Sequence, residues 1–209
     1  MPEVDPVALV APTQLTLGGR SFTAANPAVM GIVNRTPDSF YASARYDDLA
    51  LAVEAVDRLV VDGADIVDVG GVRAGQQGEW VDAAAEVERV LPLLEAIRAR
   101  HPELLLSLDT WRSEVAHACA HVRIDLVNDT WQGADPGLVA VAAELGAGYV
   151  VSHTGGAAPR TDPDGVRYGP PGPDGTRRDA DDDVIENVLT TLREGAARAL
   201  DAGIARQAV

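Results

Sequence analysis

The sequence predicts a protein of the α/β class, a TIM-type (β/α)8 barrel of which about five βα units are visible. Short apolar segments alternate along the chain with longer segments of helical periodicity. Each apolar segment ends in a polar residue, and parallel α/β folds place their functional groups at these strand ends. A closed barrel of this type has eight strands and about 250 residues. We therefore expect the 209 residues to form a truncated or incomplete barrel, with no sixth strand before Val209.

Composition narrows the choice of partners and compartment. The hydrophobic fraction of 46% is enough for the core of one domain. The formal charge of −15 argues against nucleic-acid and membrane partners, because anionic surfaces would repel the chain. Cys119 is the only cysteine, which excludes an intramolecular disulfide, and residues 1–27 lack the basic and apolar regions of a signal peptide. These features indicate a cytoplasmic protein.

Residues 1–27 are expected to be an N-terminal tail and a hairpin, ahead of a single domain over residues 28–209. Polar and apolar residues alternate from Leu15 to Phe22 across the pair Gly18-Gly19. Both glycines can adopt the positive φ angles of a tight hairpin turn. Such a hairpin would close the bottom of the barrel.

The first βα unit begins with an apolar strand over residues 29–33 that stops at Asn34. The loop that follows carries Thr36 and Asp38. A helix is predicted over residues 47–62, with Asp47 or Asp48 as its cap and Gly63 as its terminator.

Four further units follow the same pattern. A strand over residues 65–70 leads to a helix over 82–100, in which Pro92 predicts a kink. The remaining strands are expected over 104–110, 124–129 and 148–153, and the helices after them over 112–122, 136–145 and 181–202. The last of these helices follows a long loop over 154–180. His117, Cys119 and His121 lie in one helix, but Cys119 points away from the histidine face, which favours packing over metal binding.

Four motifs carry a resemblance to a known family. They stand in the chain as Gly31-Ile32-Val33-Asn34-Arg35-Thr36-Pro37-Asp38-Ser39-Phe40, Asp65-Ile66-Val67-Asp68-Val69-Gly70-Gly71, Ser107-Leu108-Asp109-Thr110 and Leu126-Val127-Asn128-Asp129. In this order they resemble dihydropteroate synthase, a pterin-binding TIM-barrel enzyme, over residues 28–209. The resemblance implies a transferase of folate biosynthesis that condenses 6-hydroxymethyl-7,8-dihydropterin pyrophosphate with p-aminobenzoate.

The resemblance also implies roles for individual residues. Asp109 and Asn128 would hold the amino-pyrimidine edge of the pterin, because a carboxylate accepts from ring N–H groups and an amide both donates and accepts. Asn34 would bind substrate and the implied cofactor Mg²⁺, a hard cation that prefers oxygen ligands. The implied catalytic residues on the first two loops are Asp38 and Arg73. The other implied substrate-binding residues are Thr36, Asp68 and His153.

The chain departs from the family pattern in several places. Its second loop, Gly70-Gly71-Val72-Arg73-Ala74-Gly75, lacks the acid and both hydroxyls of the family's Gly-Gly-Glu-Ser-Thr-Arg-Pro-Gly. Arg35 and Ser152 replace an apolar residue and a methionine. With Thr130-Trp131, these changes resemble the divergent second paralogue of high-GC bacteria, which is regarded as lacking synthase activity. The implied partners are the two small-molecule substrates, together with a homodimer or an active paralogue.

Most candidate residues also have a purely structural interpretation. Asn34 and Asn128 could hydrogen-bond their own turns, and Asp109 could cap the helix after it. Arg73 could be a solvated loop residue, and His153 could be a hydrogen-bonded structural histidine. Asp68 is different, because a carboxylate inside an apolar strand needs a buried partner.

Two alternative functions remain open. A methyltetrahydrofolate-binding methyltransferase shares the pterin-binding barrel, although the Thr36-Pro37-Asp38-Ser39-Phe40 loop favours the synthase. A non-catalytic binding or regulatory paralogue is favoured by the incomplete barrel and the altered second loop.

Overall fold

The computed structural model describes residues 13–36, 48–73, 80–161 and 184–209. The first elements are the antiparallel strands β1 (Gln14–Leu17) and β2 (Arg20–Thr23), which pair with Leu15 opposite Phe22. Gly18 and Gly19 form the turn with φ angles of 52° and 79°. The predicted hairpin is therefore confirmed, and the two glycines supply the backbone conformation that it requires.

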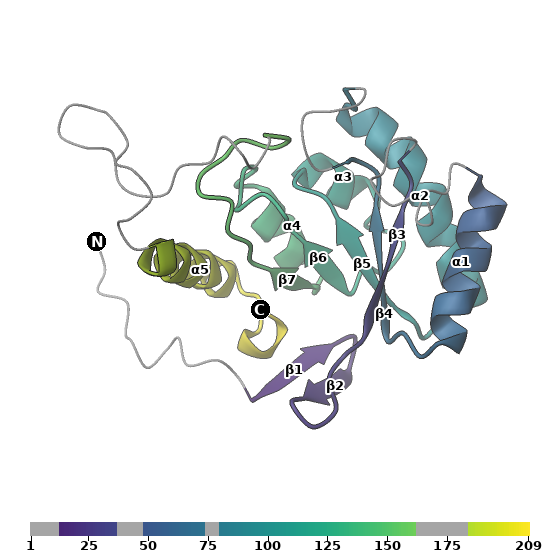
Figure 1. The fold of residues 1–209 in the computed structure, drawn as a ribbon, viewed down its shortest axis with the longest axis horizontal. Coiled ribbons are helices and arrows are strands. Elements are labelled where there is room, and N and C mark those ends of the chain that lie inside the picture. The colour runs from purple at the N-terminus through teal and green to yellow at the C-terminus, as the bar shows by residue number, and fades with distance from the viewer. Residues whose placement is uncertain (1–12, 37–47, 74–79, 162–183) are drawn as a thin grey trace.

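The five remaining strands form one parallel sheet in the order β3-β4-β5-β6-β7 (Figure 1). Their bounds are Met30–Asn34 for β3, Ile66–Gly70 for β4, Leu105–Asp109 for β5, Leu126–Asn128 for β6 and Gly148–Val150 for β7. Strand order follows chain order, as in a barrel that winds in one direction. This parallel α/β arrangement is consistent with a partial barrel, as the sequence predicts.

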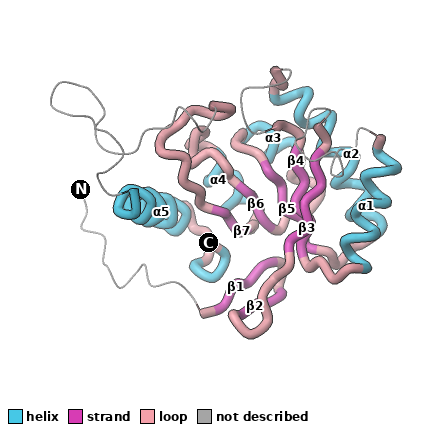
Figure 2. Tube along the Cα trace, in the orientation of Figure 1, coloured by secondary structure: helices cyan, strands magenta, loops and turns pink. Residues whose placement is uncertain are grey.

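Helices follow the strands of the parallel sheet, and Figure 2 shows how helix and strand alternate along the chain. They are α1 (Leu49–Val61), α2 (Ala83–Arg100), α3 (Ser113–Ala118), α4 (Leu138–Glu144), α5 (Val184–Asp201) and the 3-10 helix Arg206–Ala208. Asp48 and Asp82 cap α1 and α2 by accepting hydrogen bonds from the backbone N–H groups of Ala50 and Ala85. Pro92 lies inside α2.

Several predicted boundaries shift by one or two residues, and two differ by more. The helix expected over 112–122 ends at Ala118, because the chain continues in tight turns, with Val122 N–H donating to the Cys119 carbonyl, and then reverses at Arg123 with φ 21°. The strand expected to reach His153 ends at Val150. Beyond it, the Ser152 hydroxyl accepts from Gln132 N–H, which lies in the loop after β6.

The two faces of the sheet have different coverings. The outward face packs against the helices and forms the main core, which includes Val33, Val67, Val69, Leu106, Leu108 and Val127. On the inward face, Ile66, Leu105 and Leu126 lie near the N-terminal ends of the strands and pack on Leu17 and Phe22 of the hairpin. The hairpin thus covers the lower part of the inward face and leaves the C-terminal ends of the strands to other contacts.

A groove of about 770 Å³ lies between the inward face and α5, which contacts α4 (Figure 1). Its lining is mostly apolar and includes Leu15, Met30, Leu126, Val150, Leu192 and Leu200. Among the described helices, none is long and apolar enough to cross a membrane.

Candidate functional site

The candidate site is a row of polar residues at the C-terminal edge of the sheet. The register places Asn34 beside Gly70, Gly70 beside Asp109, and Asp109 beside Asn128. These four positions come from β3, β4, β5 and β6, and parallel strands end at the same edge. The structure therefore brings together three of the predicted ligand residues, which lie far apart in the sequence.

Gly70 lets the side chains on either side of it approach each other closely. A Cβ atom at Gly70 would lie 2.9 Å from Asn34 Oδ1 and 3.1 Å from Asp109 Oδ2. These two oxygens therefore converge over the Gly70 backbone from the strands on either side. A side chain at this position would displace one or both of them, so the glycine permits the close approach.

Asp68 lies one layer below the row and is 3% exposed. Its carboxylate accepts hydrogen bonds from the Ser107 hydroxyl and, at 3.1 Å, from Nδ2 of Asn128. Burial raises the pKa of Asp68, and these two donors partly oppose that rise. The buried partners that the sequence required for this carboxylate are therefore Ser107 and Asn128.

Asp109 is half-buried. Among the described residues, Thr130 donates a side-chain hydrogen bond to its carboxylate. The Thr130 hydroxyl lies 3.2 Å from Asp109 Oδ1. Burial raises the pKa of Asp109 to about 8, and the nearby charge of Asp68 adds to the rise. Near neutral pH this carboxyl can therefore gain or lose a proton, which is unusual for an aspartate and typical of functional sites.

The internal hydrogen bonds determine what the row offers to a ligand. Because Asn128 donates through Nδ2 to Asp68, its Oδ1 is the atom left to accept a hydrogen bond. Asp109 Oδ2 and Asn34 Oδ1 add two further acceptor oxygens, which converge over the Gly70 backbone. The row thus presents mainly acceptor oxygens, which suit a ligand edge rich in N–H donors.

The loop after β6 contains residues whose importance the sequence did not indicate. Asp129 is 1% exposed and accepts hydrogen bonds from the backbone N–H groups of Trp131 (2.9 Å) and Gly133 (2.6 Å) and from the Tyr149 hydroxyl (2.7 Å). Trp131 also packs edge-to-face on Trp111, with 6.3 Å between ring centroids. Asp129 was predicted only as part of a turn motif, and Tyr149, its buried partner, lies 20 residues further on.

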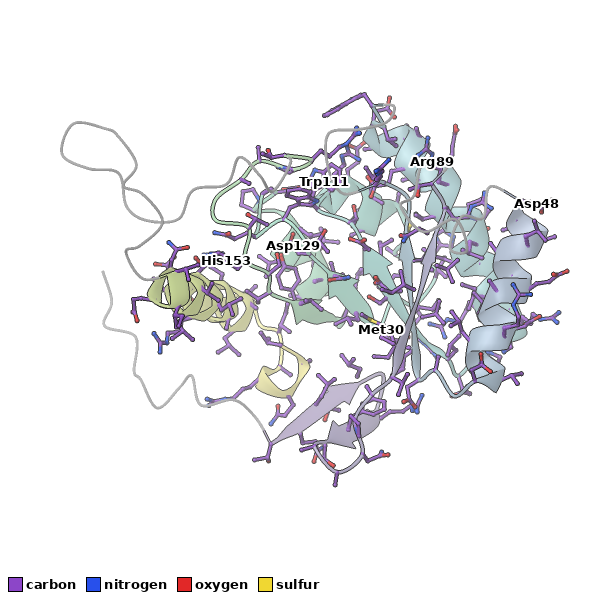
Figure 3. All side chains as sticks on the ribbon, viewed as in Figure 1. Met30, Asp48, Arg89, Trp111, Asp129 and His153 are labelled. Atoms are coloured by element: carbon purple, nitrogen blue, oxygen red, sulfur yellow. The ribbon has the colours of Figure 1, made fainter. Side chains whose placement is uncertain are left out.

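The structure also gives the surroundings of the other predicted residues. Thr36 is 3% exposed, and within the described ranges its hydroxyl has no hydrogen-bond partner. Arg73 follows β4 in the described part of the second loop, whereas Asp38 lies outside the described residues. His153 Nε2 is 2.7 Å from Asn187 Oδ1 of α5, so it links the loop after β7 to that helix. In Figure 3, Trp111 and Asp129 lie above the sheet, and His153 lies beside α5.

Asn34 is the residue expected to bind Mg²⁺. Its Oδ1 and the neighbouring Asp109 Oδ2 are oxygen donors of the kind that Mg²⁺ prefers. Across the described parts of the chain, no group of three or more His, Cys, Asp or Glu side chains could hold a metal ion. Two protein oxygens fit a magnesium ion that keeps several waters and binds a phosphate ligand.

Elsewhere, Cys119 is buried and His121 hydrogen-bonds Glu95, so both make structural contacts.

Parallel strands that alternate with helices, with hydrogen-bond acceptors gathered at the C-terminal strand ends, are typical of barrel-type proteins that bind a ligand at that edge. The family model described as "Pterin binding enzyme" matches residues 30–209, and the chain therefore belongs to the pterin-binding enzyme family.

Within this family the chain is similar to the Mycobacterium tuberculosis H37Rv protein named "Inactive dihydropteroate synthase 2". The two are 48% identical over 194 residues, which is 93% of this chain and 58% of the relative. The chain thus spans less than two thirds of the length of this relative.

Solved dihydropteroate synthases share the fold. The Xanthomonas albilineans enzyme with 4-aminobenzoic acid matches with a TM-score of 0.70 and 31% identity, over 94% of this chain and 64% of that chain. The Yersinia pestis enzyme in a sulfonamide drug complex matches with a TM-score of 0.77 and 28% identity, over 92% of this chain and 65% of that chain. These neighbours support the assignment of the described sheet to a TIM-barrel family.

Proposed function

We propose that this chain binds the amino-pyrimidine edge of a pterin at Asp109 and Asn128, as a dihydropteroate synthase-like protein of folate biosynthesis. One observation carries the proposal. Asn128 donates through Nδ2 to the buried Asp68, which leaves its Oδ1 as an acceptor on the strand next to Asp109. An amino-pyrimidine edge carries a ring N–H and an exocyclic amino group, and these donors complement the two oxygens.

The ionisation of Asp109 gives this recognition its strength. A hydrogen bond to a charged group contributes about 1.5–3 kcal/mol, against about 1 kcal/mol for a neutral pair. Since the pKa of Asp109 is about 8 in the protein without ligand, N–H donors from a ligand would favour the ionised form. Binding should therefore be accompanied by release of a proton near neutral pH.

The first loop would face the leaving group of a pterin pyrophosphate. Asn34 lies on the opposite side of Gly70 from Asp109, and Thr36 follows it by two residues. In the synthase reaction the carbon–oxygen bond to pyrophosphate breaks, the arylamine nitrogen bonds to the same carbon, and the amine loses a proton. A bound Mg²⁺ at Asn34 would offset the negative charge of the departing pyrophosphate.

We infer that this chain binds the pterin without performing the synthase reaction. The relative named "Inactive dihydropteroate synthase 2" is 48% identical to it. The altered second loop agrees, because Val72 and Ala74 offer no polar side chain where the family has an acid and a hydroxyl.

Isothermal titration with 6-hydroxymethyl-7,8-dihydropterin pyrophosphate and Mg²⁺ tests binding, and assay of dihydropteroate after addition of p-aminobenzoate tests turnover. The wild type should bind, and Asp109→Asn and Asn128→Ala should each lose at least about tenfold in affinity, as expected for one hydrogen bond to a charged or buried group. Asp48→Asn is the matched control, because Asp48 caps α1 away from the row and asparagine caps helices equally well.

Absence of heat in wild-type protein that is folded by circular dichroism would contradict pterin binding. Formation of dihydropteroate by the purified chain would contradict the non-catalytic assignment while leaving the binding site intact.

A further inference from the structure

Thr130 lies directly beside the carboxylate on which the candidate site depends. Its hydroxyl donates to Asp109 Oδ1 over 3.2 Å, and the residue itself is exposed. Thr130 follows Asn128 by two residues, at the start of the loop after β6. The site therefore carries its own hydroxyl donor at a position where a ligand donor would otherwise bind.

The fold holds Thr130 in this position through its two neighbours in the chain. Asp129 and Trp131 are only 1% and 9% exposed. The Asp129 carboxylate accepts from Trp131 N–H and from the Tyr149 hydroxyl, and the Trp131 ring packs against Trp111. Because both neighbours are fixed in buried contacts, the contact between Thr130 and Asp109 is a consequence of the loop architecture.

Because of this hydrogen bond, the two oxygens of the Asp109 carboxylate have different surroundings. Oδ1 is engaged by Thr130, whereas Oδ2 lies over the Gly70 backbone, 3.1 Å from the position of a Cβ atom on that residue. A ligand with two adjacent N–H donors usually binds both oxygens of a carboxylate. In this chain such a ligand meets one open oxygen and one that already accepts a hydrogen bond.

We propose that Thr130 is a specificity-determining residue that weakens the preference of the site for ligands with two adjacent donors. This inference rests on the proposed pterin-binding function and names the residue that tunes it. With Thr130 present, a ring that offers a single N–H to Asp109 binds nearly as well as one that offers an N–H and an amino group. The consequence is a broader ligand range than the Asp109–Asn128 pair alone would give.

Two probes separate these ligand types. 6-Hydroxymethylpterin offers a ring N–H and an adjacent amino group, whereas 6-hydroxymethyllumazine has an oxo group in place of the amine. Each probe is titrated calorimetrically into wild type, Thr130→Val and Thr130→Ser. Valine has the shape of threonine without the hydroxyl, and serine keeps the hydroxyl.

The ratio of pterin affinity to lumazine affinity should rise on the order of tenfold in Thr130→Val, the effect of about one charge-assisted hydrogen bond, and should stay near the wild-type value in Thr130→Ser. A residue with a merely structural role would change both affinities together and leave the ratio unchanged.

If wild type and Thr130→Val both bind the pterin and show the same ratio of pterin affinity to lumazine affinity, this inference is overturned and the proposed function stands. Pterin binding by Thr130→Val alone would contradict the proposed function of the wild type, and it would overturn the inference as well, because Thr130 would then block binding and not adjust the preference between two bound ligands. If folded wild-type and variant proteins bind neither probe, the proposed function fails and the inference fails with it.

Discussion

Asn128 donates a hydrogen bond from Nδ2 to the buried carboxylate of Asp68, over 3.1 Å, although the two residues lie on strands separated by β5. The contact is possible because Ser107, the β5 residue paired with Asp68, is small and also donates to that carboxylate. Asp68 therefore acts as a support that sets the orientation of the Asn128 amide. For this reason the Asn128 amide keeps its acceptor oxygen, Oδ1, for other contacts.

Asp109→Asn should be more stable than the wild type, and this difference in stability should grow as the pH rises. The folded-state pKa of Asp109 is about 8, above its ordinary value of 3.8. The neutral carboxyl therefore favours the folded state fully below about pH 4, and this contribution is lost as the pH rises to about 8. Asparagine cannot ionise, so the variant should be more stable than wild type by about 1–3 kcal/mol at pH 8, after allowance for partial solvent screening.

Urea unfolding of both proteins at pH 4, 6 and 8 measures the effect. The difference between wild type and variant should grow with pH, and Asp48→Asn should show no such trend. A constant difference across this range would contradict the raised pKa. Greater stability combined with weaker ligand binding would mark Asp109 as a functional residue that is costly to the fold.

Gly70→Ala should weaken ligand binding with a modest loss of stability. The new methyl group would lie 2.9 Å from Asn34 Oδ1 and 3.1 Å from Asp109 Oδ2, so both side chains must move apart. Calorimetric titration should show a loss of at least about tenfold in affinity, the effect of one misplaced hydrogen bond.

Gly31→Ala is the contrasting variant. A Cβ at Gly31 would lie 2.8 Å from a Leu59 methyl group of α1, on the opposite face of the sheet. Overpacking of this kind costs about 1–3 kcal/mol. This variant should lose stability in urea and keep its ligand affinity, and equal binding defects in both variants would show that the effect of Gly70→Ala is not local.

Tyr149→Phe should loosen the loop that carries Thr130. The Tyr149 hydroxyl donates to Asp129 Oδ2 over 2.7 Å in a buried position, and phenylalanine removes this donor while keeping the ring. The loss should be about 1–3 kcal/mol of unfolding free energy, because one buried carboxylate oxygen loses a partner. Hydrogen exchange should also be faster at the backbone N–H groups of Trp131 and Gly133, and unchanged protection there would contradict the role assigned to Tyr149.

Asp125→Ala should be among the most destabilising changes at the opposite end of the sheet. The Asp125 side chain is 3% exposed, and its Oδ2 accepts from Arg98 Nη2 and from Leu106 N–H, each over 3.0 Å. Removal of one partner of a buried ion pair costs about 3–5 kcal/mol.

Glu54→Ala provides the comparison, because Glu54 forms an exposed ion pair with Arg58. Both side chains are 61% exposed, and Arg58 Nη1 lies 3.9 Å from Glu54 Oε2. Exposed pairs of this kind contribute about 0–1 kcal/mol, so its urea midpoint should stay close to that of wild type. Similar midpoints for Asp125→Ala and Glu54→Ala would contradict the importance of the buried pair.

The sequence predicted the repeating units well because their signals are local. Apolar periodicity identified the strands and helices, Gly18-Gly19 identified the hairpin, and Asp48 and Asp82 cap their helices within three residues. Polar residues at the strand ends also placed Asn34, Asp109 and Asn128 at one edge, since parallel strands end together. Boundaries were less accurate where the chain leaves regular structure without a local marker, as after Ala118 and Val150.

The sequence by itself thus determined the α/β class, the order of the units and the edge at which the polar residues gather, because each depends on a short and regular pattern. Only the tertiary structure decided which atoms of those residues are already hydrogen-bonded and which are left for other contacts. The orientation of Asn128, the raised pKa of Asp109 and the hydroxyl of Thr130 at Asp109 all depend on contacts between strands and loops distant in sequence. Such contacts arise from strand register and burial, which a linear pattern does not specify.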